Sequence, residues 1–473
     1  MFEVDMKVPI VVALCRYLWR YVGKQCSAIF PTAGAFEMVL GKRRILRSRA
    51  SLGRPFSTHL SVVGLANLAD GVLQAGLPLL AITLTQSPIH LGLLAASVWL
   101  PWLILGLIAG TMLDRWDRRK TMLVALSLRA VLLGVGALLM HGDRMTIQLL
   151  LVIALLYGVT EVFTDISAGA QVPALVGKAP KKVRLASSRL LAVEQIVNGF
   201  VGKPVSGLLV AAAATWVFAG PAASVVLAVF LLAVFLRGPF SPSPDALPAD
   251  RSSLFAELSQ GLDVMWKHPV LRPTVLACAL WNLASSAFGA VIVLWMVGAS
   301  SVGQLTEPQW GLVLVALSAG AVAGSWATRL FVERWSEIRV LAVAWTGNAL
   351  IHFTPVFSQE FVTFTMFFLL VGFFGAIGNV ISGSFRARMI PTSLLGRVGG
   401  ASRTIGYGSL PLGALTGGYL GDAFGISAVL AGVPIVMLAA TLVISAAISQ
   451  SLIEECESSK PCDTPTTQQK EAV

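Results

Sequence analysis

The chain has 473 residues, of which 56% are hydrophobic and only 12% are charged, and its formal net charge is +11. An ordinary soluble domain carries roughly 25% charged residues. A soluble fold could not bury the apolar surface of a chain with this composition, so a soluble protein is excluded. Several segments reach the roughly 18–20 apolar residues that cross a bilayer as a helix. The sequence therefore predicts an all-α membrane protein.

Residues 1–56 precede the first predicted span. The stretch "VPIVVALCRYLW" is short for a span and is interrupted by Arg16, and "GKRRILRSR" is strongly basic. Two interpretations stay open: a cytoplasmic extension without regular structure, or a basic anchor that binds anionic lipid at the cytoplasmic surface.

Six apolar segments follow, and together they predict a first six-helix bundle at 57–236. Their approximate bounds are 57–83, 89–112, 121–140, 146–176, 187–212 and 214–236.

Ionisable side chains inside these spans are costly and mark functional sites by default. Asp70 lies in the first span, Arg129 in the third, and Glu161 and Asp165 lie at i,i+4 on one face of the fourth. We expect Asp70 and Glu161 to form a proton-linked site, and Arg129 to neutralise Asp165. The alternative is that each acid forms a structural pair with a basic neighbour.

The fifth span contains Gly202-Lys203-Pro204, and Glu194 precedes it by two turns. Lys203 either extends to the membrane interface or faces a cavity where it binds an anionic substrate, and both interpretations stay open. Glu194 lies close to the cytoplasmic edge, so we assign it a structural role.

Six of the eleven residues in "GTMLDRWDRRK" (110–120), between the second and third spans, are charged. We expect Asp114 to cap the third span and to meet Arg118 at i+4. The basic residues keep this loop on the cytoplasmic side of the membrane.

Residues 237–270 separate two sets of six spans. The stretch "GPFSPSPDALPAD" is rich in proline and cannot span. After it, Leu254, Leu258, Leu262 and Trp266 recur every four residues, and Ser253 is placed to cap their start. This pattern predicts an amphipathic helix on the cytoplasmic face.

The second set predicts a bundle at 271–450, followed by a cytoplasmic tail at 451–473. Its spans are expected at 271–298, 308–330, 339–357, 361–384, 395–420 and 424–449. The stretch "LANLADGVLQA" (65–75) resembles "LWNLASSAFGA" (280–290), which aligns Asn67 with Asn282. The halves thus predict two pseudo-symmetric bundles with a site between them. Asn282 and Asn379 are the candidate polar residues that this half adds to the cavity.

The basic residues predict the orientation. Twenty lysines and arginines lie at the connections from even to odd spans, whereas Arg144 alone lies at the opposite connections. This bias places both termini in the cytoplasm. Topology accounts for the positive charge, so we expect no nucleic-acid binding.

The loop at 110–120 resembles the signature loop of the major facilitator superfamily. The pattern Gly-x-x-x-Asp-Arg-x-x-Arg-Arg-Lys is matched by Gly110, Asp114, Arg115, Arg118, Arg119 and Lys120. Together with "VPALV" (172–176), the segment at 84–120 is also similar to the branch of enterobactin-type siderophore exporters and macrolide-efflux proteins, the transmembrane secretion effectors.

The resemblance implies a twelve-helix transporter fold. It also implies that Asp114 and Arg118 clamp the two halves at the cytoplasmic side and control their separation; the alternative is a plain stop-transfer charge cluster. Gly202-Lys203-Pro204 departs from the family's Gly-Pro pair, so we do not carry over the role of that pair in proton antiport.

We therefore expect a proton-coupled secondary exporter of a small amphipathic molecule (a drug, macrolide or siderophore) in a bacterial plasma membrane, working as a monomer. A carrier of lysophospholipids or nutrients with the same fold is the alternative. The sequence has neither a His-Glu-x-x-His motif nor a glycine-lysine phosphate loop, so a membrane-embedded enzyme or sensor is disfavoured. We expect no metal or other cofactor.

Overall fold

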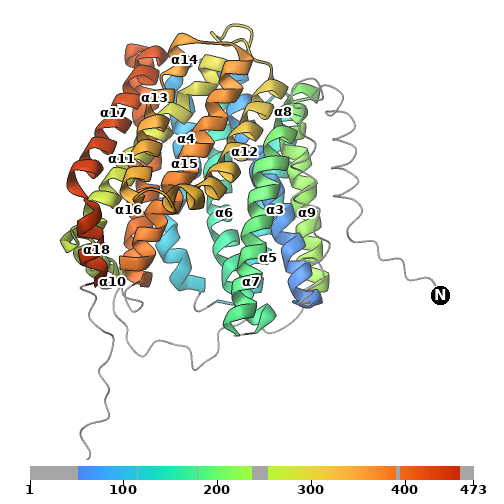
Figure 1. The fold of residues 1–473 in the computed structure, drawn as a ribbon. Coiled ribbons are helices and arrows are strands. Elements are labelled where there is room, and N and C mark those ends of the chain that lie inside the picture. Colours follow the sequence, from blue (N-terminus) through green and yellow to red (C-terminus); the bar gives the residue numbers. More distant parts are fainter. Residues whose placement is uncertain (1–51, 114–115, 178, 237–253, 390–394, 459–473) are drawn as a thin grey trace, which may run out of the picture. The chain divides into compact units, whose positions relative to one another are not determined.

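The computed structural model describes residues 52–113, 116–177, 179–236, 254–389 and 395–458 (Figure 1). Residues from Gly53 onward belong to one compact unit. The described part of this unit is helical and has no strand, apart from an isolated bridge between Val297 and Leu305. The predicted all-α fold is confirmed. Almost all of the predicted N-terminal extension, 1–56, lies outside the described residues.

The first half of this unit contains six helical rods. They are α3 (Arg54–Leu84), α4 (Pro88–Leu113), α5 (Arg118–His141), α6 (Ile147–Val176), the continuous stretch of α7 (Pro180–Gln195), η2 (Ile196–Gly202) and α8 (Lys203–Ala212), and α9 (Trp216–Phe235).

The second half begins with the short helix α10 (Leu254–Lys267) and ends with α18 (Gln450–Ser458). Between them lie α11 (Leu271–Met296), α12 (Glu307–Val332), α13 (Glu337–Ile351), α14 (Thr354–Phe357), α15 (Phe361–Met389), α16 (Leu395–Phe424) and α17 (Ile426–Ala447).

All twelve predicted spans coincide with helices, but not all of these helices are equally apolar. Ten are long and apolar enough to cross a membrane by length and composition. The fifth predicted span is broken by the π-helical segment η2 and carries a cluster of charged residues in α7. The eleventh, α16, is a 30-residue helix rich in glycine. Charged residues in α7 and glycines in α16 lower the mean hydropathy of these two predicted spans.

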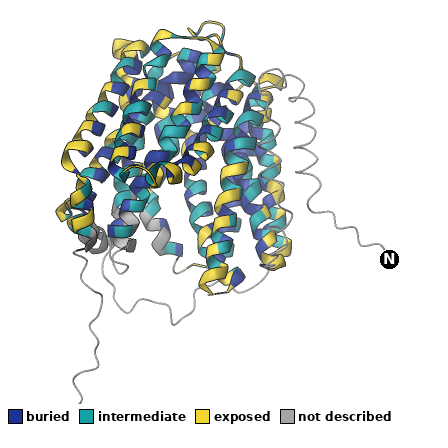
Figure 2. Ribbon diagram, viewed as in Figure 1, coloured by how far each residue is buried: buried dark blue, intermediate teal, exposed yellow. Residues whose placement is uncertain are grey.

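The third span, α5, shows how the sequence produces a helix that faces lipid on one side. Val124, Val131 and Leu138 recur every seven residues and are 66%, 63% and 74% exposed. The opposite face, which includes Met122 and Arg129, is buried. Figure 2 shows the same division between exposed outer and buried inner faces over much of the helical unit. A large apolar surface of this kind marks a membrane-facing boundary.

A helix, α10, lies where the amphipathic helix was predicted, but Trp266, the last residue of the predicted apolar stripe, is not on its buried side. Met265 lies in a buried cluster with Val270 and with Ile453 of α18, whereas Trp266 on the outer side is 51% exposed. The predicted capping residue Ser253 lies outside the described residues. Packing of one apolar face thus attaches α10 to the second half.

Two seams join the halves: α4 packs beside α16 and α11, and η2 and α8 pack beside α12 (Figure 1). A Cβ on Gly92 would lie 2.6 Å from the Ala414 carbonyl oxygen, and one on Gly207 would lie 2.4 Å from that of Glu307. Glycine therefore permits direct backbone contact in both seams. These contacts join the start of α4 to the second half of α16, and the middle of α8 to the start of α12. Both lie at the end of the bundle opposite Arg118.

Candidate functional site

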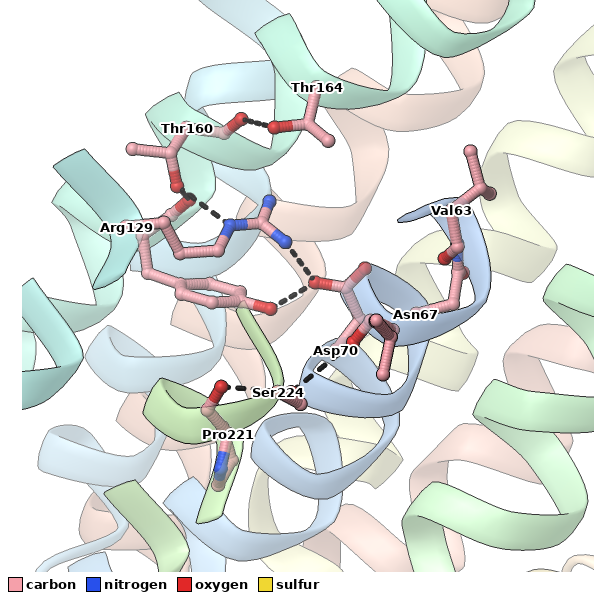
Figure 3. Close-up of polar contacts among 10 residues, drawn as sticks. Val63, Asn67, Asp70, Arg129, Thr160, Thr164, Pro221 and Ser224 are labelled. Carbon is pink, nitrogen blue, oxygen red and sulfur yellow. Dashed lines mark hydrogen bonds and ion pairs between the residues drawn. The ribbon is translucent and has the colours of Figure 1, made fainter. Parts of the chain in front are cut away.

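The centre of the first half contains a buried ion pair between Asp70 of α3 and Arg129 of α5. The Arg129 Nη1 atom lies 2.8 Å from Asp70 Oδ1, and the two side chains are 0% and 3% exposed (Figure 3). Arg129 Nε also donates a hydrogen bond of 3.1 Å to Thr160 Oγ1 of α6. The remaining nitrogen, Nη2, is buried and has no hydrogen-bond partner among the residues that the structure describes. A buried charge is stable only when it is paired, so this contact fixes the arrangement of three helices.

The pairing of Arg129 differs from the predicted one. We expected Arg129 to neutralise Asp165, because both residues are at similar depths in their spans. The structure instead pairs Arg129 with Asp70, so that expectation is wrong. Depth along a helix positions a Cα atom, but the direction of the long arginine side chain decides which carboxylate it contacts.

Tyr157 of α6 completes the site, and the sequence analysis missed it. Its hydroxyl donates a hydrogen bond to Asp70 Oδ1, the atom that Arg129 also contacts. The Arg129 guanidinium carbon lies 4.7 Å from the centroid of the Tyr157 ring. Tyr157 precedes Thr160 by three residues and Glu161 by four, so all three share one helical face. That spacing could have indicated that Tyr157 faces the same site as Glu161. A tyrosine in an apolar span is, however, more often a packing residue.

Three further carboxylates surround this pair. Glu161 and Asp165 of α6 and Glu194 of α7 all interact electrostatically with Asp70. None of the three makes a hydrogen bond or ion pair within the described part of the chain, and each is partly exposed. Asp70 was predicted to act with Glu161, and Arg129 with Asp165; in the structure all four belong to one electrostatic cluster. Glu194, which we interpreted as structural, belongs to the same electrostatic cluster.

The other predicted cavity residues lie elsewhere. Lys203 begins α8 directly after η2, is partly buried, and forms no ion pair with the described residues. Asn282 Nδ2 donates a hydrogen bond of 3.2 Å to the Gly406 carbonyl and so links α11 to α16. Asn379 is an exposed residue of α15. These three side chains do not join the Asp70 cluster.

The charged loop at 110–120 is partly described: Asp114 and Arg115 lie outside the described residues, and Gly110 lies within α4. The Asp117 side chain accepts a 2.9 Å hydrogen bond from the Lys120 backbone N–H and caps α5. The expectation that Asp114 caps this helix is therefore wrong. Asp117 occupies the N-cap because α5 begins at Arg118, three residues before the predicted start of the span.

The two arginines at the start of α5 bind backbone carbonyls of their own half. Arg118 Nη1 donates a 3.1 Å hydrogen bond to Ala170 of α6. Arg119 Nη2 lies 3.3 and 3.0 Å from the carbonyl oxygens of Leu232 and Ala233 near the end of α9. The last carbonyls of a helix lack internal partners and attract cations. Arg119 thus caps α9 from the side.

The segment η2 connects the charged site to a seam between the halves. A Cβ on Gly71, the residue after Asp70, would lie 2.5 Å from the Asn198 carbonyl oxygen, and one on Gly202 would lie 2.7 Å from Gly71 Cα. On the side facing the second half, Ser318 of α12 donates a 3.2 Å hydrogen bond to the Gly199 carbonyl. π-Helical segments of this kind frequently occur at functional sites.

Aromatic residues from both halves meet at the other seam. The Tyr407 ring of α16 lies 6.1 Å from Trp99 and 5.7 Å from Trp102 of α4, measured between ring centroids. Tyr407 is 37% exposed. This group presents aromatic surface where the halves meet, whereas Trp281 stacks on the buried Trp345 within the second half.

Comparison with known proteins gives the family of the chain. The family model described as transmembrane secretion effector matches residues 60–471. The multidrug efflux pump Tap of Mycolicibacterium fortuitum is 26% identical over 389 residues, which cover 79% of this chain and 90% of the pump. The enterobactin exporter EntS of Salmonella typhimurium is 24% identical over 330 residues, covering 68% of this chain and 71% of the exporter.

Two solved transporter structures have a similar fold. The nucleoside transporter NupG superposes with a TM-score of 0.64 at 10% identity, covering 84% of this chain and 99% of that one. A bacterial homolog of the human lysosomal transporter Spinster, in an inward-facing and unoccupied conformation, gives a TM-score of 0.62 at 12% identity. That match covers 86% of this chain and 99% of the homolog.

Proposed function

Because the chain belongs to the transmembrane secretion effector family of the major facilitator superfamily, we propose that it exports a small amphipathic molecule in exchange for protons. The direction of transport and the substrate class (a drug, macrolide or siderophore) follow from likeness to the multidrug efflux pump and the enterobactin exporter. A carrier of lysophospholipids or nutrients is the alternative with the same fold.

The buried pair of Asp70 and Arg129 carries the proposal of proton coupling. Both side chains lie at most 3% exposed inside a membrane helix bundle. There, loss of the carboxylate charge would leave the guanidinium without its ion-pair partner. Proton binding at Asp70 therefore changes the stability of this packing. It also changes the electrostatic interaction of Asp70 with the nearby acids Glu161 and Asp165. Charge that is costly and paired in this way is typical of proton relays.

The seams support an assignment of the access state. Close backbone contacts lie at the end of the molecule away from Arg118. With the loop at 110–120 and both termini in the cytoplasm, as the basic residues predict, the outer end is the closed one and the cavity opens inward. The predicted latch of Asp114 and Arg118 then acts in the opposite, outward-facing state. In the inward-facing state, Arg118 is bound to Ala170 of its own half.

The domain organisation follows the same scheme. We assign 57–236 and 271–450 to the two moving bundles, 237–270 to the cytoplasmic linker with its amphipathic helix, and 1–56 and 451–473 to cytoplasmic extensions. The protein works as a monomer in the plasma membrane of a bacterial cell.

The experiment that tests this function is a substrate screen in cells that lack or overproduce the protein, with and without a protonophore. The wild type should lower the accumulation of at least one amphipathic compound, and the protonophore should abolish this effect. Asp70→Asn should abolish it too, whereas Asp263→Asn should not, because Asp263 forms an exposed pair with Lys267. Export that survives both the protonophore and Asp70→Asn would contradict the proposal.

A further inference from the structure

The proposed proton site includes Tyr157, a residue that the sequence patterns did not indicate. We propose that Tyr157 is a positioning residue of this site, which holds the Asp70 carboxylate through its hydroxyl and the Arg129 guanidinium through its ring. The inference rests on the proposed proton coupling at Asp70.

The geometry gives the two oxygens of Asp70 different roles. Arg129 Nη1 and the Tyr157 hydroxyl both donate to Oδ1, and no described residue donates a hydrogen bond to Oδ2. An incoming proton from the aqueous phase therefore binds Oδ2, and neither donor has to be displaced. Tyr157 fixes which oxygen is available.

The ring of Tyr157 acts on the cation. Arg129 Cζ lies 4.7 Å from its centroid, within the range of a cation–π contact. Once Asp70 is protonated, Arg129 loses the charge of its partner, and this contact helps the hydrogen bonds to Thr160 and to Asp70 Oδ1 to hold the guanidinium in place. Tyr157 is 3% exposed, and the Thr160 hydroxyl donates a 2.7 Å hydrogen bond to its backbone carbonyl. The residue is thus fixed at both ends.

Charged residues of three neighbouring helices contribute to the electrostatic environment of Asp70. Arg129 of α5 supplies the positive charge, and the carboxylates come from Glu161 and Asp165 of α6 and Glu194 of α7. The Tyr157 hydroxyl is neutral, and it stabilises the charged form of Asp70 by hydrogen bonding. Its removal should make Asp70 hold its proton up to a higher pH.

The test is an infrared pH titration of the full-length protein in lipid films, without substrate. The carbonyl band of protonated carboxyl groups is followed, and the component that is absent from Asp70→Asn is assigned to Asp70. In Tyr157→Phe, which keeps the ring, the midpoint of this component should rise by about one pH unit, the effect of losing one hydrogen bond to a charged group. Tyr419→Phe on α16, where the tyrosine is 64% exposed, should leave it unchanged.

A second variant separates positioning from folding. Tyr157→Leu removes both hydroxyl and ring, so it should shift the midpoint and also lower the unfolding temperature more than Tyr157→Phe does. If Tyr157→Phe lowers the unfolding temperature but leaves the midpoint within about 0.2 units of the wild type, Tyr157 is only structural and the inference fails. If Asp70→Asn removes no titrating component at all, the proposed proton site itself fails.

Discussion

Neutralising one partner of the buried ion pair should destabilise the protein far more than neutralising both. The side chains of Arg129 and Asp70 are 0% and 3% exposed. Neutralising either one leaves the charge of the other buried without its partner. Removing one partner of such a pair costs about 3–5 kcal/mol. Asp70→Asn and Arg129→Gln should each lower stability by this order.

The double variant Asp70→Asn/Arg129→Gln should recover a large part of that loss. It contains no unpaired charge, and its amides retain hydrogen-bonding capacity toward Thr160 and Tyr157. The assay is thermal unfolding of all four proteins in the same lipid nanodiscs, analysed as a double-mutant cycle with an expected coupling above about 3 kcal/mol, the lower cost of one single change.

An exposed ion pair provides the control for this cycle. The Arg329 and Glu333 side chains are 85% and 58% exposed and pair at i,i+4, so Glu333→Gln should change the unfolding temperature little. Additive single effects at Asp70 and Arg129, with no recovery in the double variant, would refute the reasoning that the two charges depend on each other.

Three further predictions concern other parts of the molecule. Gly202→Val should force η2 away from Gly71, whose Cα would lie 2.7 Å from the added Cβ, and should slow transport in a flux assay while the protein still reaches the membrane. Arg119→Gln should lower the unfolding temperature through loss of the α9 cap, whereas Lys120→Gln, at an exposed position, should not. Burial lowers the pKa of His268 from 6.5, and its Nδ1 accepts hydrogen bonds from the backbone at the start of α11. The neutral ring therefore contributes stability above about pH 6.5. That contribution is lost as the pH falls through the lowered pKa, so His268→Gln should flatten the decline of unfolding temperature below pH 6.5.

Span positions could be predicted well because bilayer thickness imposes a length that apolar composition reveals. The predicted 146–176 and 361–384 compare with helices at Ile147–Val176 and Phe361–Met389. Asp70 and Arg129 could also be identified as candidates, since an ionisable side chain is conspicuous in an apolar segment. Helix ends were less predictable: α5 begins at Arg118, three residues before the predicted start of the span, and Asp117 rather than Asp114 caps it.

The contacts within the site could not be predicted, because they depend on side-chain directions and on packing between distant helices. Nothing in the spacing of Asp70, Arg129 and Tyr157 shows that two donors converge on one carboxylate oxygen. The π-helical turn after Gln195 was equally hidden, since the Gly-Lys-Pro sequence indicates a kink but not its form. It allows η2 to touch both Gly71 and α12.

The central claim is that the protonation state of Asp70 controls the opening of the seams between the halves. Spin labels at Asp143 and Ser300, on loops of the two halves at the end opposite Arg118, would report the distance across that end in a cysteine-free background. The account predicts that the distance distribution of the wild type changes when the pH is lowered, because proton binding removes the charge that Asp70 presents to Arg129, and that Asp70→Asn removes this change. A pH-dependent distance that persists unaltered in Asp70→Asn would contradict the claim.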